Sequence, residues 1–203
     1  NIEVHAAKLK KIPVMSAGEA TGAFMKGEIL GEQFTGISVA GTHGKTTTTA
    51  MIATVLKENG MDPSYIIGTG DVKSLGVPGY LGKGRYFVAE ADEYATEPVH
   101  DRRARFLWQH PTFAVFTNIE HDHPDIYPTI DSVRETFLEF ANNLPPKGLL
   151  IACGDDPEVR QLLKEFNGKA VTYGFGAGND YILERATISG DQTFFWVKSY
   201  GVP

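Results

Sequence analysis

Residues 37–49 of the chain read ISVAGTHGKTTTT, and the predicted fold is built outward from this stretch. Its first four residues suit a buried strand, and two glycines, a lysine and several threonines follow. A helical pattern then runs through residues 50–58. In a strand, loop and helix of this order, the loop N–H groups and the positive end of the helix dipole point at one anion. The stretch predicts a phosphate-binding loop; the alternative is an ordinary strand-to-helix turn, where glycine and threonine are also common.

Two side chains of the loop fit a nucleotide. Lys45 supplies a full positive charge for terminal phosphates, and Thr46 offers a hydroxyl to Mg²⁺. The strict P-loop pattern has a glycine where this chain has Val39, so the match is to a shorter variant.

Composition narrows the class of protein. The chain has 203 residues, 42% of them hydrophobic, which is enough for a sizeable core. A net charge of −6 and a pI of about 5.5 argue against broad binding to nucleic acid or to anionic membranes. No apolar run is long enough to span a bilayer, and no signal-peptide pattern opens the chain. Cys153, the single cysteine, is expected in the core and fits a reducing cytoplasm. We expect both ends to be cuts in a longer polypeptide, because Asn1 is not a natural start residue.

The rest of the chain alternates between strand and helix patterns, which indicates an α/β fold with a doubly wound, mostly parallel sheet. We expect Asp131 to cap a helix, and residues 68–84, rich in glycine, to form a loop. The expected helices are residues 2–11, a helix from Ser16 with a capping box to Glu19, and residues 50–58, 131–144 and 156–166. The expected strands are residues 13–15, 64–68, 85–93, 112–119, 148–153 and 170–175, with a hairpin of 181–188 and 193–199.

Polar clusters follow two of these strands, at residues 90–93 (EADE) and 120–125 (EHDHPD). Together with the phosphate loop they would converge on one rim of a doubly wound sheet. Lys45, Thr46, Glu90 and His123 then form a set suited to a nucleoside triphosphate and Mg²⁺. Residues 90–93 could instead be a solvated strand end. Residues 121–123 (HDH) could be a zinc or manganese site, or a cap and turn without a ligand.

The basic stretch at residues 101–105 (DRRAR) is flanked by aromatic residues. It fits an exposed helix face better than a binding site for an anionic substrate.

Three motifs together resemble the Mur ligase family in order and spacing: AGTHGKTTT at 40–48, EADE at 90–93 and TNIEHDHPD at 117–125. These are ATP-dependent, amide-forming enzymes of peptidoglycan precursor synthesis. The loop is most similar to the branch that adds L-alanine to UDP-N-acetylmuramate, and the murein peptide ligases share its form. The resemblance implies that residues 1–33 are the end of a Rossmann-like, UDP-binding N-terminal domain with its linker. Residues 34–203 would be the central ATP-binding domain, truncated at its C-terminal end.

The resemblance also implies roles for individual residues. Lys45, His123 and Asn118 would be catalytic, with Asn118 near the nucleotide. Thr46, Glu90 and His123 would bind Mg²⁺. The residues that would hold the ATP phosphates are Gly41, Thr42, His43, Gly44, Lys45, Thr46 and Thr47. In the family mechanism, the muramoyl carboxylate attacks the γ-phosphate, and the amine then attacks the resulting acyl phosphate.

Some residues depart from the alanine-adding pattern. Tyr94 stands where that branch usually has serine, which favours the peptide ligases, whereas residues 155–160 (DDPEVR) favour the alanine-adding branch. The motifs also leave open a folylpolyglutamate synthase, which His43 and Glu90 fit less well, and a non-catalytic nucleotide-binding module. The amine-donor domain lies outside this sequence. We therefore predict that the 203 residues alone have no ligase activity.

Overall fold

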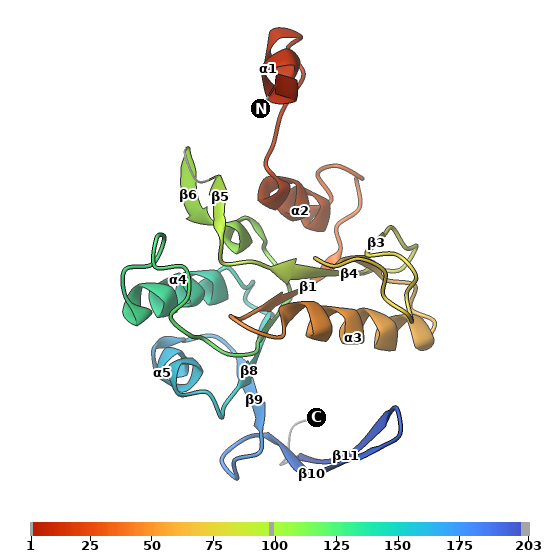
Figure 1. Cartoon of the computed structure of the whole chain (residues 1–203), viewed down its shortest axis with the longest axis vertical. Helices are drawn as coiled ribbons and strands as arrows, with labels where there is room; N and C mark the ends of the chain where they lie inside the picture. The colour runs from red at the N-terminus through yellow and green to blue at the C-terminus, as the bar shows by residue number, and fades with distance from the viewer. Residues whose placement is uncertain (1, 98–99, 200–203) are drawn as a thin grey trace.

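The computed structural model describes residues 2–97 and 100–199, and its centre is one large mixed sheet (Figure 1). The sheet has nine strands in the order β11-β10-β9-β8-β7-β1-β4-β2-β3. Only the pairs at its two edges, β2 with β3 and β10 with β11, are antiparallel. The predicted doubly wound, mostly parallel α/β fold is confirmed. The helices are α1 (Ile2–Leu9), α2 (Ala17–Lys26), α3 (Lys45–Glu58), α4 (Ile130–Asn142), α5 (Pro157–Glu165) and the 3₁₀ turn η1 (Arg105–Trp108). The strands of the large sheet are β1 (Thr35–Ala40), β2 (Ser64–Ile66), β3 (Gly79–Tyr80), β4 (Tyr86–Ala91), β7 (Phe113–Phe116), β8 (Leu149–Cys153), β9 (Ala170–Gly174), β10 (Tyr181–Ser189) and β11 (Gln192–Ser199). A separate hairpin pairs β5 (Ala95–Glu97) with β6 (Asp101–Ala104).

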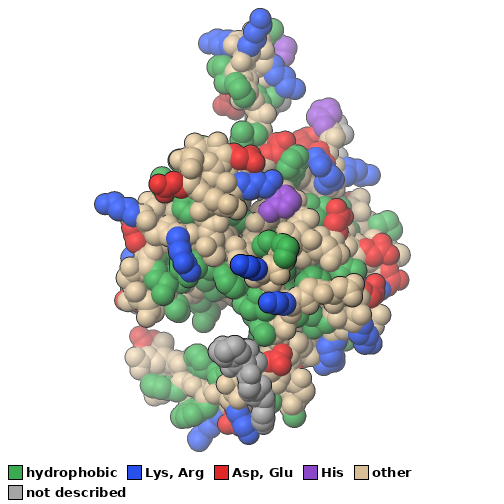
Figure 2. Space-filling view, turned by 180° about the vertical axis from the view of Figure 1, so that it is seen from behind, with side chains coloured by type: hydrophobic (Ala, Val, Ile, Leu, Met, Phe, Trp, Pro, Cys, Tyr) green, Lys and Arg blue, Asp and Glu red, His purple; other side chains and the backbone are tan. Residues whose placement is uncertain are grey.

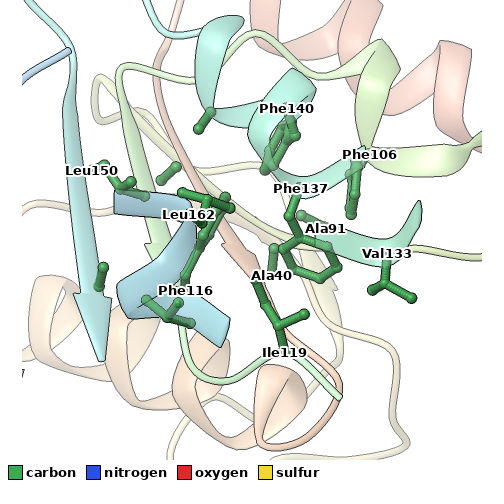
Figure 3. Close-up of a cluster of buried hydrophobic side chains, with 14 of the residues drawn as sticks. Ala40, Ala91, Phe106, Phe116, Ile119, Val133, Phe137, Phe140, Leu150 and Leu162 are labelled. Carbon is green, nitrogen blue, oxygen red and sulfur yellow. The ribbon is translucent and has the colours of Figure 1, made fainter. Parts of the chain in front are cut away.

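Helices cover the two faces of the sheet unequally. On one face α3 packs over β1, β2 and β4 through Ala53, which contacts a cluster that includes Ile37 and Val88. On the other face α4, α5 and η1 bury the larger core, in which the rings of Phe106, Phe116, Phe137 and Phe140 meet (Figure 3). Strand alternation explains both layers, since side chains at successive positions of β1 point to opposite faces.

The three central strands end level with one another. Ala40 at the end of β1 pairs with Ala91 of β4 on one side and with Phe116 of β7 on the other. After β1 the chain adds β2 and β4 on one side of β1, and it later adds β7 on the other side. The strand order therefore changes direction at β1, which makes β1 the topological switch point of the sheet. A ligand crevice is expected outside the carboxyl ends of the strands at such a point.

Helix caps explain several element boundaries. Ser16 and Glu19 form the predicted capping box at the start of α2. The prediction that Asp131 caps the next long helix is wrong: Thr129 is the N-cap of α4, and Asp131 lies inside the first turn, where it pairs with Arg134. Thr129 is the cap because its hydroxyl accepts the N–H of Ser132. Asp131 is already in helical conformation, and its side chain is not placed to make that bond.

Other boundaries also correct the sequence-based prediction. Residues 13–15 are not a strand; they are an exposed, unpaired connection between α1, which buries no residue, and α2. Residues 68–84 are not wholly loop, because β3 pairs there with β2. Residues 101–104 are strand β6 rather than a helix face.

The C-terminal hairpin of β10 and β11 is set off from the body by a hollow (Figure 2). Cys153 lines a cavity of about 590 Å³ there, with Tyr173, Phe175, Phe195 and Val197 among its neighbours. Cys153 is therefore half-buried beside this cavity rather than in the core as predicted.

In the described part of the chain, none of the helices has the length and apolar character required to cross a bilayer.

Candidate functional site

The phosphate loop joins β1 to α3 through residues 41–44. Gly41 (φ +144°) and Gly44 (φ +80°) both adopt backbone conformations that other residues rarely take. Gly44 is also the N-cap of α3, where no side chain caps the helix. No side chain among the described residues therefore competes with an anion for the first N–H groups of α3.

Residues that follow β7 fasten this loop. The N–H of His43 donates to Oδ1 of Asn118 at 2.9 Å, and the Thr117 hydroxyl donates to the carbonyl of His43 at 2.6 Å. The N–H of Glu120 donates to the Thr42 hydroxyl at 2.9 Å. Thr117 and Glu120 were not predicted as site residues, although both lie in the motif at residues 117–125. Asn118 thus shapes the loop, with its side-chain N–H₂ turned to Glu120 at 3.0 Å.

Glu90 lies against the first turn of α3. One of its carboxylate oxygens accepts a hydrogen bond from the Thr46 hydroxyl at 3.2 Å, and the other accepts the N–H of Gly68 at 2.6 Å. Burial raises the pKa of Glu90, and the hydrogen bond from Gly68 opposes that rise. One hydroxyl and one carboxylate side by side fit Mg²⁺, which prefers oxygen ligands and keeps waters and phosphate oxygens in its shell.

Lys45 turns back toward the loop and a buried acid. Its amine donates to the carbonyl of Gly41 at 2.7 Å and forms an ion pair with Glu93 at 3.0 Å. His123 approaches the same carboxylate, with 3.7 Å between its Nε2 and Oε1 of Glu93. Lys45 and His123, from two strand ends far apart in sequence, therefore meet at Glu93. The sequence placed Glu93 in the acidic run but gave no signal that separated its role from that of Glu90.

His121 makes its contact at the turn before α4, and Thr47 lies beside Thr46 along a groove next to α3. His121 is hydrogen-bonded to the carbonyl of Tyr127 at 2.9 Å, so it holds the turn before α4. Within residues 2–97 and 100–199, no three His, Cys, Asp or Glu side chains are grouped to hold a metal. Thr47 faces a groove of about 560 Å³ between α3 and the loop at residues 69–74.

The basic stretch at residues 101–105 makes structural contacts. Arg103 forms an ion pair with Asp101 at 2.7 Å and lies 4.3 Å from the centre of the Trp108 ring. Arg105 approaches Asp92 at 3.8 Å.

The chain matches the model of the Mur ligase middle domain over residues 39–200. It is 41% identical over its whole length to UDP-N-acetylmuramate–L-alanine ligase of Geobacter sp. (strain M21), and 42% identical over 90% of its length to the enzyme of the same name from Carboxydothermus hydrogenoformans. The chain spans 41% and 36% of those two relatives.

Two solved structures share the fold. One is UDP-N-acetylmuramate:L-alanyl-γ-D-glutamyl-meso-diaminopimelate ligase from Neisseria, with a TM-score of 0.77, 26% identity, and coverage of 97% of this chain and 60% of that one. The other is UDP-N-acetylmuramate–alanine ligase from Thermotoga maritima, with a TM-score of 0.74, 26% identity, and coverage of 98% and 41%. The match of the middle-domain model to most of the sequence, on a fold whose central strands bring the three motifs to one edge, shows that the chain belongs to the Mur ligase family.

Proposed function

We propose that this chain is the ATP-binding part of a ligase that joins L-alanine to UDP-N-acetylmuramate in peptidoglycan precursor synthesis. The observation that carries the proposal is the meeting of Lys45, Glu93 and His123 beside the Thr46–Glu90 pair, at the level ends of β1, β4 and β7. The names of the relatives that are 41–42% identical support the substrates.

We assign the domains in the same way. Residues 34–203 would belong to the central ATP-binding domain, in keeping with a family match that begins at residue 39. Residues 1–33 would be the end of a UDP-binding domain and its linker. The lack of buried residues in α1 is consistent with a segment whose usual neighbours precede it.

The chemistry follows from the charges at the strand ends. A carboxylate is a poor electrophile because its oxygen is a poor leaving group. An oxygen of the muramoyl carboxylate therefore first attacks the γ-phosphorus of ATP, the bond to the β–γ bridging oxygen breaks, and ADP leaves, which gives an acyl phosphate. The amine of L-alanine then attacks the acyl carbon and expels phosphate. The loop N–H groups at residues 41–47 and the Lys45 amine would bind and orient the phosphates, which is most of what phosphoryl transfer requires.

Magnesium would be held by Thr46 and Glu90, and His123 would face a second ion. The Nε2 atom of His123 is buried without a hydrogen-bond partner, 3.4 Å from the carboxylate of Asp122 and 3.7 Å from that of Glu93, and it would be the ligand atom. When bound, the ions would supply neutralisation of the charge between two anionic reactants. ATP and a UDP-linked substrate, together with the single cysteine, favour a cytoplasmic enzyme.

A specific observation also supports a peptide-adding ligase. The structure from Neisseria is named for a tripeptide that the enzyme joins to UDP-N-acetylmuramate. Tyr94, which departs from the alanine-adding pattern, lies against His123 with 4.3 Å between ring centres and a tilt of 53° between the rings.

Phosphate release by the full-length protein distinguishes the candidates. ATP, Mg²⁺ and UDP-N-acetylmuramate are supplied with either L-alanine or the tripeptide L-alanyl-γ-D-glutamyl-meso-diaminopimelate. We expect release with L-alanine; release only with the tripeptide would select the peptide ligase, and release with neither would refute both. The chain of 203 residues alone should show none.

A histidine variant separates a ligase from a nucleotide-binding switch. His123→Ala should abolish turnover and largely retain ATP binding, whereas His5→Ala, on the exposed α1, should retain both. Unchanged turnover in His123→Ala would contradict the proposed role.

A further inference from the structure

Glu93 is a buried acid between two of the proposed catalytic side chains. Its carboxylate is 4% exposed, and its oxygens lie 3.0 and 3.3 Å from the amine of Lys45. The same carboxylate lies 3.7 Å from Nε2 of His123. A buried carboxylate is unfavourable unless it is paired, so its position here is maintained by the charge of Lys45.

The neighbours of Glu93 hold it at this position. Its carbonyl accepts the hydroxyl of Tyr127, a buried residue from the turn before α4, at 2.6 Å. The next residue, Tyr94, is tied to η1 because its carbonyl accepts the N–H of Arg105 at 2.8 Å. The ring of Tyr94 then lies against that of His123, tilted by 53°, with 4.3 Å between ring centres. Contacts from two further elements therefore fix the backbone on both sides of the carboxylate.

His123 depends on these contacts for its orientation. Its backbone adopts a positive φ of 56°, a left-handed conformation that is uncommon for residues other than glycine. No hydrogen bond restrains its buried Nε2. The ring is therefore placed by Tyr94 on one side and by the carboxylates of Glu93 and Asp122 on the other, the latter at 3.4 Å.

We propose that Glu93 is a positioning residue of the ligase reaction, which fixes the Lys45 amine and the His123 ring relative to each other and is the counter-ion of Lys45 before the nucleotide arrives. The inference rests on the proposed function. It adds a cost that the function alone does not imply: a fixed negative charge beside Lys45 opposes the binding of phosphate. Glu93 therefore weakens ATP binding in exchange for alignment.

The kinetic test is made on the full-length protein, with nucleotide affinity measured by titration calorimetry in the presence of Mg²⁺. Glu93→Gln keeps the shape and removes the charge. We expect its dissociation constant for ATP to fall about five- to tenfold, the size of a screened charge–charge interaction, while its kcat falls about 10- to 100-fold through misalignment. Glu93→Asp restores the negative charge. It should recover part of kcat, and its dissociation constant for ATP should return to that of the wild type. Glu158→Gln removes the acid of another ion pair, with Arg134 on the far helices, and should change neither quantity.

A role limited to stability predicts a different pattern. If Glu93→Gln loses ATP affinity and kcat together, or keeps kcat within twofold of the wild type, the proposal is overturned.

A second measurement needs no activity. In the ligand-free 203-residue chain, acetylation of Lys45 by an N-hydroxysuccinimide ester is followed by mass spectrometry. The Glu93 ion pair should protect the amine, so labelling should be several-fold faster in Glu93→Gln and unchanged in Glu158→Gln. Equal protection in all three proteins would refute the pairing. Faster labelling in a protein whose full-length form shows no ligase turnover would refute the proposed function and retain the Lys45–Glu93 pair.

Discussion

Two glycines of the phosphate loop should respond very differently to the same substitution. A Cβ added to Gly41 would lie 1.9 Å from the hydroxyl oxygen of Thr117 and 3.1 Å from the backbone of Asn118, whereas a Cβ on Gly44 would meet nothing within 4 Å. Both residues have positive φ, so each alanine variant bears a backbone cost of about 1–2 kcal/mol.

Gly41→Ala bears a second cost. A contact of 1.9 Å must be relieved by moving Thr117, whose hydroxyl is bonded to the carbonyl of His43. Overpacking of this kind costs about 1–3 kcal/mol. We therefore expect Gly41→Ala to lower the free energy of unfolding by about 2–5 kcal/mol, and Gly44→Ala by the backbone cost alone.

Urea unfolding of the 203-residue chain, followed by circular dichroism, gives these differences. A double-mutant cycle then isolates the collision. Thr117→Ala should destabilise the wild type, because it loses the bond to His43, but should recover about 1–3 kcal/mol in the Gly41→Ala background. If the two glycine variants are equally destabilised, or if the cycle shows no coupling, the close approach of the loop to the end of β7 is refuted.

Three further substitutions test the core, the sheet and a charged turn. Phe137→Ala should lower the free energy of unfolding by about 3–5 kcal/mol in urea, because the fully buried ring leaves a cavity; a loss below about 1 kcal/mol would contradict its packing. Ser38→Ala should cost about 1–3 kcal/mol in the same assay, because it leaves the buried Oε1 of Gln109 without its donor; a neutral result would show that water replaces the hydroxyl. Asp155 accepts two backbone N–H groups of the turn at Phe175, and these bonds lower its pKa. Its stabilisation is therefore full above the unfolded pKa of about 3.9 and is lost as the pH falls through the lower folded value. Asp155→Asn should be less stable than the wild type by about 1 kcal/mol at pH 7, and the difference should shrink steadily as the pH falls below about 3.9. A difference in melting temperature that does not change with pH over this range would refute the charge effect.

The sequence predicted the strands and helices whose signals are local. The apolar run before Gly41 is long enough to be a buried strand, and the Ser16–Glu19 capping box marks a helix start without reference to the rest of the chain. These features are confirmed because each depends on residues a few positions apart.

The secondary-structure predictions were wrong where contacts with distant parts of the chain determine the conformation. Residues 13–15 have strand-like composition, but no neighbouring strand is present to pair with them in the described part of the chain. Residues 101–104 have a helix-like charge pattern, yet they pair with β5, and Arg103 is held by Asp101 and Trp108. Exposed, short segments take their conformation from such partners.

The site was predictable in outline and not in detail. The three motifs meet at one edge because parallel strands end together. Glu93 and Thr117 were missed, since their roles depend on which way a side chain turns after its strand has ended. The spacing of the acids at residues 90–93 does not record that direction.

The fastening of the phosphate loop also orders the events of folding. His43 is bonded to Thr117 and Asn118, which lie 74 and 75 residues further along the chain. Neither the glycines nor the helix start is sufficient to give the loop its shape, so a nascent chain that ends before β7 has the loop residues without their scaffold. Affinity for phosphate should therefore appear late in folding, when β7 docks beside β1. A chain that stops before that step should neither bind nucleotide nor hydrolyse ATP.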